Sequence, residues 1–198
     1  MPARGERRRL APEERRAQIL DAAFRCFGEK GYHASRMDDL VRASGLSKGN
    51  LYLHFESKEA VFLALFDAFE AEVFAAWEEE AEHTAGALAL LRREGEIVLE
   101  RMLSQRMLVA AWMEFLTHPA ARDRLQLTYE RTRARLVALL ARGVGAGELR
   151  GDLPLEEVAA LFTGAIEGLV LQAFVDPAFD ARGCFDRTFT VYEKGIAR

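Results

Sequence analysis

Apolar residues recur at helical spacing through most of the chain. The first such segment opens at Pro12, which suits a first helical turn, and closes at Gly31, which suits the position after the last turn. Its apolar positions lie mostly three or four residues apart, and they are Ile19, Leu20, Ala23, Phe24 and Phe27. The pattern predicts an amphipathic helix between Pro12 and Gly31.

Two shorter helices are expected next, on either side of Gly45. Ser35 is the expected N-cap of the first helix and Ser47 of the second. Gly45 lies in the turn between them, where a positive φ is expected and glycine adopts it without steric cost. The positions expected to point inward are Leu40, Val41, Leu46, Leu51 and Phe55. This arrangement predicts a helix-turn-helix.

The remainder of the chain is also expected to be helical. A long helix is expected from the N-cap Ser57 through an apolar stripe that ends at Trp77. Further helices are expected at about 87–105, 107–118, 120–143, 155–174 and 181–194, separated by prolines, glycines and aspartates. No segment alternates with period two for long enough to predict a strand. The expected fold class is therefore all-α, with about nine helices.

Charge divides the chain into two parts. Residues 1–58 carry 12 Lys and Arg against 8 Asp and Glu, whereas residues 59–198 carry 15 against 23, and the net charge of the whole chain is −4. A basic head on an acidic body predicts a nucleic-acid-binding domain over 1–58 and a second domain over 59–198. The basic arm of the first domain is expected to be either a solvated tail or a DNA-contacting segment. Its cations are Arg4, Arg7, Arg8 and Arg9.

The outer side of the helix after Gly45 carries groups that suit the major groove of DNA. Lys48 offers a cation for a phosphate or a guanine edge, and Asn50 can pair with an adenine edge or bind phosphate. Gly49 allows a close approach of the backbone to the bases. Only this first turn, residues 48–50, is expected to read the base sequence, while Tyr52 and His54 donate to phosphates.

Three stretches resemble the DNA-binding domain of TetR-family regulators: RAQILDAA from Arg16, FGEKGY from Phe27 and ASGLSKGNLYLHFESKE from Ala43. The resemblance covers residues 14 to about 65 without a gap. It implies that the helix after Gly45 is the recognition helix, and that four residues contact the DNA backbone, namely Ser35, Tyr52, His54 and Lys58. Arg36 stands where the family often has Ser or Thr, so it either adds a phosphate contact or lies in solvent. The full expected DNA-binding set is Ser35, Arg36, Ser47, Lys48, Gly49, Asn50, Tyr52, His54 and Lys58.

The second half resembles the BetI-type C-terminal domain of the same family. The stretches that carry the resemblance are WMEFL, HPAAR, GELR and GAIEGLVLQ. It implies an Ω-shaped homodimer whose interface is formed by residues 155–174 and 181–194. Composition supports this interface, because 155–174 is apolar nearly all round and contains small residues that allow helices to approach closely. These small residues are Ala159, Ala160, Gly164, Ala165 and Gly168. The alternative is a monomer that buries this helix internally.

The same resemblance implies a cavity for a small-molecule effector in the C-terminal domain. The expected ligand-binding residues are Phe66, Phe74, Trp77, Leu103, Arg106, Trp112, Phe115, Tyr129 and Phe162. Plain core packing is the alternative for each aromatic residue. The expected function is a transcriptional repressor that binds a palindromic operator as a homodimer and is released by a small, largely apolar effector. The alternatives are an activator, or a DNA-binding regulator without an effector.

No motif predicts catalysis, a cofactor or a metal site, so an enzyme is not expected. The four histidines lie outside HExxH and away from any cysteine at zinc spacing, and there is no P-loop, GxSxG or Rossmann glycine pattern. Cys26 and Cys184 are expected to be free thiols in a reducing cytoplasm, with a disulfide or a redox sensor as alternatives. No run reaches the roughly 18 consecutive apolar residues typical of a membrane span, so no membrane partner is expected.

Overall fold

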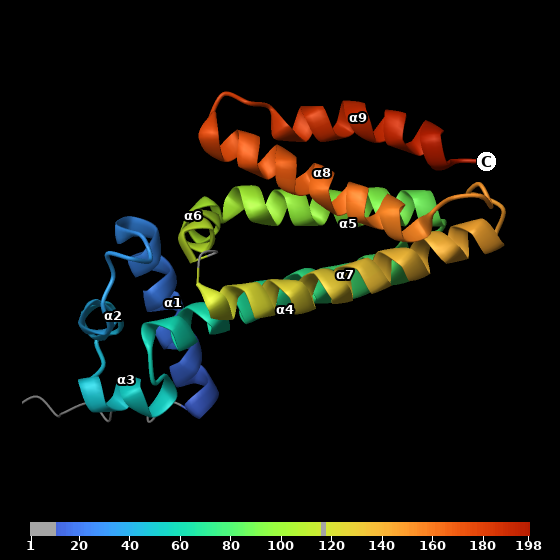
Figure 1. The fold of residues 1–198 in the computed structure, drawn as a ribbon. Coiled ribbons are helices and arrows are strands. Elements are labelled where there is room, and N and C mark those ends of the chain that lie inside the picture. The colour runs from blue at the N-terminus through green and yellow to red at the C-terminus, as the bar shows by residue number, and fades with distance from the viewer. Residues whose placement is uncertain (1–10, 116–117) are drawn as a thin grey trace, which may run out of the picture. The chain divides into compact units, whose positions relative to one another are not determined.

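The structure, a computed structural model, describes residues 11–115 and 118–198, apart from the side chains of Leu108 and Phe115. Within these residues it contains nine helices and no strand, which confirms the predicted all-α class (Figure 1). The helices are α1 (Pro12–Lys30), α2 (Met37–Ser44), α3 (Lys48–His54), α4 (Lys58–His83), α5 (Ala87–Ser104), α6 (Arg106–Phe115), α7 (Pro119–Gly145), α8 (Leu155–Val175) and α9 (Ala181–Ile196). The predicted basic arm lies outside the described residues.

The chain divides into two compact units, the first ending at Asp67 and the second beginning at Ala68. The division falls inside α4, later than the boundary expected after Lys58. The reason is aromatic packing at the start of α4, where the Phe62 ring centroid lies 5.7 Å from that of Phe27 and 5.1 Å from that of Tyr32. Phe62 is fully buried by these contacts, so the first turns of α4 belong to the first unit.

In the first unit, α1 supports the two short helices that follow it. The amide of Gln18 donates a hydrogen bond of 3.0 Å to the carbonyl of Ser44, the last residue of α2. The guanidinium of Arg16 lies 4.4 Å from the ring centroid of Phe55, the residue that follows α3. The apolar core between the helices includes Ile19, Ala22, Ala23, Phe27, Leu40, Leu51 and Phe55. α1 is therefore tied to the C-terminal ends of both α2 and α3.

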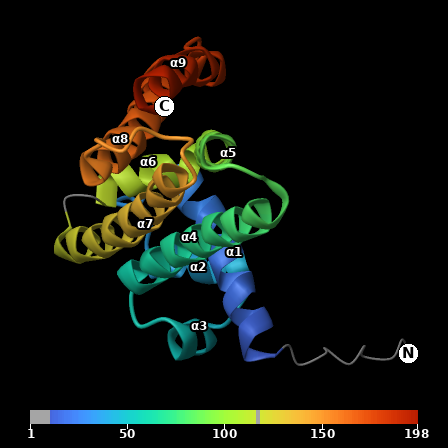
Figure 2. The same cartoon turned by 90° about the vertical axis from the view of Figure 1, so that its right-hand side faces the viewer.

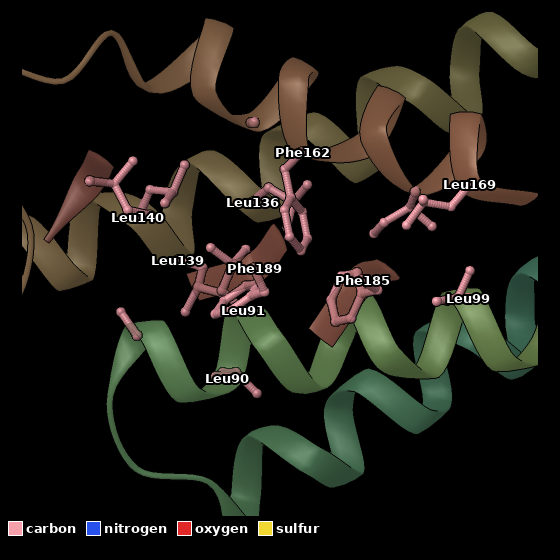
Figure 3. Packing of buried hydrophobic residues seen from close by; sticks show 14 of the residues in the cluster. Leu90, Leu91, Leu99, Leu136, Leu139, Leu140, Phe162, Leu169, Phe185 and Phe189 are labelled. Carbon is pink, nitrogen blue, oxygen red and sulfur yellow. The ribbon is translucent and has the colours of Figure 1, made fainter. Parts of the chain in front are cut away.

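In the second unit, α5 is the central helix. Figures 1 and 2 show α9 and the later part of α4 on opposite sides of it. Figure 3 shows leucines of α5 and α7 pointing toward Phe162 of α8 and Phe185 of α9. Gly95 allows α5 to approach these rings, because a Cβ at that position would lie 2.7 Å from Phe162 and 2.8 Å from Phe185. Contacts this short show that α5 packs there through its backbone.

α8 is the one described helix that is long and apolar enough, by length and composition alone, to cross a membrane. Its inner side lies in the core of the second unit and includes Phe162 and Ile166. Glu167 of α8 accepts a hydrogen bond of 2.6 Å from the hydroxyl of Tyr129 on α7, and burial raises the pKa of this carboxyl. These contacts are those of a core helix in a helical domain.

Candidate nucleic-acid interface and effector region

The turn between α2 and α3 has the predicted backbone. Gly45 adopts φ +69° and ψ 15°, and its N–H donates to the carbonyl of Val41 at 3.1 Å. This is the left-handed conformation that glycine adopts without steric cost, so the predicted role of Gly45 is confirmed. Ser47 caps α3 as predicted, because its hydroxyl oxygen accepts the backbone N–H of Asn50 at 3.3 Å.

The predicted N-cap of α2 was wrong. Arg36 is the N-cap, and the carboxylate of Asp39 accepts its backbone N–H at 2.8 Å. Asp39 also pairs with Lys30 at 2.7 Å and with Arg42, and these hydrogen bonds hold the pKa of Asp39 well below its usual range. The hydroxyl of Ser35 instead donates to the carbonyl of Gly31 at 2.7 Å. Ser35 is thus a buried residue of the turn between α1 and α2, and Asp39 supplies the cap.

α3 has a buried side and an exposed side. Leu51 and the adjoining Phe55 are buried, as predicted. On the other side, a Cβ built at Gly49 would meet no atom within 4 Å, and the phenol of Tyr52 is exposed. Lys48 pairs with Asp38 of α2 at 3.0 Å, and this hydrogen bond raises the pKa of Lys48. Lys48 is therefore charged and lies beside the exposed side of α3.

Lys58, the first residue of α4, points its ammonium into the turn between α1 and α2. The Nζ atom donates to the carbonyls of Tyr32 at 2.7 Å and of Ser35 at 2.9 Å, and it lies 4.2 Å from the centroid of the Tyr32 ring. Ser57 caps α4 as predicted, because its hydroxyl oxygen accepts the N–H of Ala60 at 3.0 Å. The start of α4 is thereby attached to the residues that precede α2.

Comparisons with known proteins agree with this geometry. Residues 19–65 match the model of bacterial regulatory proteins of the tetR family, and residues 98–186 match that of the BetI-type transcriptional repressor C-terminal domain. The transcriptional repressor AcnR of Corynebacterium glutamicum is 30% identical over 163 residues, which cover 80% of this chain and 81% of AcnR. This chain belongs to the TetR family. It is a transcriptional regulator with a BetI-type C-terminal domain, as its sequence predicted.

Solved structures of transcriptional regulators share the fold. A regulator from Saccharomonospora viridis in complex with choline has a TM-score of 0.79 and 24% identity, over 94% of this chain and 99% of that one. FadR from Bacillus subtilis in complex with stearoyl-CoA has a TM-score of 0.78 and 21% identity, over 91% of this chain and 98% of that one. At these identities the likeness concerns the fold alone.

In this TetR-family chain, two of the predicted effector residues lie together between α4 and α7. The rings of Phe74 and Trp77 are 5.0 Å apart between centroids, and the indole N–H of Trp77 donates to the carbonyl of Glu94 at 3.1 Å. Arginines of α7 cover both rings, with the Arg131 guanidinium 5.0 Å from the Phe74 centroid and that of Arg135 5.3 Å from the Trp77 centroid. The two aromatic side chains are therefore stacked against cations.

Two buried carboxylates balance these arginines. Glu70 of α4 is 6% exposed and pairs with Arg124 at 2.5 Å and with Arg131 at 3.3 Å. Glu94 of α5 is 1% exposed and accepts from Arg135 at 2.8 Å through Oε1, while its buried Oε2 has no hydrogen-bond partner within the described residues. Burial raises the pKa of Glu94 against the opposing effect of Arg135. These glutamates were not among the predicted site residues. Glu94 lies in a charged run, residues 92–96, that is typical of a solvated helix face, whereas Glu70 lies between Phe69 and Ala71.

The other predicted effector residues lie in separate places. Leu103 and Arg106 line a pocket of about 270 Å³ together with Ser104, Ala173, Phe179, Asp180, Ala181 and Arg182. Phe162 is a core residue, 6.5 Å from Phe185 and 6.2 Å from Phe189 between ring centroids. Phe66 is buried in the first unit and Trp112 is half-buried on α6. The side chain of Phe115 lies outside the described residues.

We predict that Lys58→Met destabilises the first unit by about 2 kcal/mol, because two carbonyls lose a charged hydrogen-bond donor. Urea unfolding monitored by circular dichroism measures the change. Lys48→Met is the matched control, since Lys48 has an exposed ion pair with Asp38 and its loss should leave the unfolding curve nearly unchanged. If the two variants unfold alike, the structural role of Lys58 is refuted.

Proposed function

We propose that this regulator binds a palindromic operator as a homodimer through α3, represses transcription, and is released by a small-molecule effector. The observation that carries the proposal is the division of α3 into a side anchored by Leu51 and Phe55 and an exposed side that carries Lys48 and Gly49, with the half-buried Asn50 beside them. A recognition helix needs both properties, because its inner side must hold it rigidly while its outer side enters the major groove.

The proposed DNA-contacting residues divide into two roles. Lys48 exchanges its exposed partner Asp38 for a phosphate or a guanine edge. The exchange costs little free energy, because exposed ion pairs contribute little to stability. Asn50 reads a base edge. The remaining contacts to the sugar-phosphate backbone come from Arg36, Ser47, Tyr52 and His54. Ser35 and Lys58 act by holding the turn before α2, since the hydroxyl of Ser35 and the ammonium of Lys58 are engaged there.

The operator proposal is tested by fluorescence anisotropy with DNA from upstream of the protein's own gene and with a scrambled duplex. We expect specific binding whose affinity falls steeply with salt, because phosphate contacts release counterions. Tyr52→Ala should weaken binding to every sequence, whereas Asn50→Ala should relax selection at one base pair of the half-site, at a cost of about 1–3 kcal/mol.

Gln126→Ala on the exposed surface of α7 is the control and should bind like the wild type. Equal affinity of the wild type for both duplexes at all salt concentrations would refute the operator proposal.

The proposed dimer interface is the outer side of α8 together with α9. Leu161, Leu171 and Val175 are exposed there, and Gly164 and Gly168 have open space where a Cβ would lie. These five residues are spaced by three and four, so they form one stripe along the helix. Val191 of α9 is 72% exposed as well. An apolar stripe with glycines between the large residues suits close packing of helices from two subunits.

We predict that Leu171→Glu converts the dimer to a monomer, because it places a charge in the proposed apolar interface. Size-exclusion chromatography with light scattering gives the mass, and operator affinity should fall because each subunit supplies one half-site contact. Leu127→Glu on α7 is the matched control, since Leu127 is 46% exposed and Leu171 is 47% exposed. A Leu171→Glu protein that remains dimeric would contradict this interface.

For the effector, we propose an apolar molecule with a polar end that occupies the pocket at Leu103. Half of the lining is apolar and half is polar: the apolar residues are Leu103, Ala173, Phe179 and Ala181, and the polar ones are Ser104, Arg106, Asp180 and Arg182. In small-molecule sites apolar walls bind the ligand and polar groups orient it. This mixed lining suits an effector that has both an apolar part and a polar end.

Thermal unfolding with octanoate, octylamine and naphthalene-carboxylate as probes tests the effector proposal. We expect at least one probe to raise the Tm of the wild type, because a ligand that binds only the folded state stabilises it. Leu103→Trp should abolish the rise by filling the pocket, whereas Leu127→Trp on the exposed side of α7 should retain it. A rise that survives Leu103→Trp would exclude this pocket as the effector site, and the absence of any rise would contradict an apolar effector.

A further inference from the structure

Leu53 has the most exposed large apolar side chain in the described part of the chain, with 84% of its surface accessible. It lies on α3, two residues from the buried Leu51 and two from the buried Phe55, which places it on the opposite side of the helix. A single exposed leucine is ordinary on a protein surface. What distinguishes this leucine is its place on the open side of the proposed recognition helix.

Leu53 shares a helix face with Gly49 and Asn50, which precede it by four and three residues. Long side chains on a helix lean toward its N-terminus, so Leu53 leans toward Gly49. Gly49 has no side chain, and a Cβ there would meet no atom within 4 Å. We call Gly49, Asn50 and Leu53 the reading face: an open backbone position, an amide and an isobutyl group side by side.

We propose that Leu53 selects a thymine in each operator half-site through contact with the C5-methyl group of that base. The inference rests on the proposed function of α3. An isobutyl group neither donates nor accepts a hydrogen bond, and the thymine methyl is the apolar feature that base edges display in the major groove. Base reading therefore extends beyond the first turn of α3, residues 48–50, to which the sequence pattern alone assigns it.

Contact with a deoxyribose is the competing role for an apolar side chain in this position. Every nucleotide carries a deoxyribose, so such a contact would add affinity without selecting a base. The thymine methyl can be removed by itself, because deoxyuridine pairs like thymidine and lacks only this group. The two roles therefore make different predictions for the same duplex.

The experiment uses the full-length protein and the duplex that it enriches from a random DNA pool. Each thymidine is replaced in turn by deoxyuridine, and Kd is measured by fluorescence anisotropy at constant salt. For the wild type we expect about a fourfold loss of affinity per half-site at one thymine, which corresponds to the burial of one methyl group. Elsewhere the replacement should have no effect.

Variants at Leu53 complete the test. Leu53→Ala should bind the thymine and uracil duplexes equally, whereas Leu53→Met, which keeps an apolar side chain of similar volume, should retain the difference. Leu127→Ala is the control for an exposed leucine outside the interface and should behave like the wild type.

Wild-type insensitivity to uracil at every position, or an unchanged uracil effect in Leu53→Ala, would overturn the thymine contact. A loss in Leu53→Ala that is equal on all duplexes would also overturn it, in favour of a sugar contact. Failure of the wild type to enrich any sequence would instead refute the proposed function of α3, so the two failures are distinguishable.

Discussion

The first unit depends on how a seven-residue helix is held in place. Helices as short as α3 are not stable by themselves, because nucleation costs more than a few hydrogen bonds return. Here the cap at Ser47 and the burial of Leu51 and Phe55 fix the helix. All of these contacts are made at the start of α3, at its end or on its buried side. The outer side is consequently exposed on a helix that is held in place, which is the condition that the proposed DNA contacts require.

The turn before α2 connects this arrangement to the helix that continues into the second unit. Lys58 donates hydrogen bonds to carbonyls of that turn, and the hydroxyl of Ser35 donates to the carbonyl of Gly31 at its start. Asp39 caps α2 directly after the turn. Since α4 is continuous from Lys58 to His83, the residue that anchors the turn is also the first residue of the helix in which the first unit ends and the second begins. Lys58 therefore helps to position the residues that precede α2.

The second unit combines two kinds of interior. Around α5, α8 and α9 the core is apolar and closely packed, as the contact of Gly95 with Phe162 and Phe185 shows. Between α4 and α7, aromatic rings alternate with arginines, and Glu70 and Glu94 are buried beside them. Buried ion pairs add little net stability, because desolvation offsets their attraction. They do favour one specific alignment of α4 with α7, since a shift would leave buried charges unpaired.

The sequence by itself determined the helices, the left-handed turn at Gly45, the caps at Ser47 and Ser57 and the family, because these follow from local spacing and from residue types with a strong conformational preference. The tertiary structure alone decided which polar groups face inward. Ser35 and Lys58 are residue types that often contact DNA. In the folded chain, however, their hydrogen-bond partners are backbone carbonyls of the segment between α1 and α2. Glu94 resembles a surface residue until α7 places Arg135 against it, and Leu53 resembles a core residue until Leu51 and Phe55 fix the opposite side of α3 in the interior. Hydrophobic period and capping act within a few residues, whereas the pairing of polar groups depends on chain segments far apart in sequence.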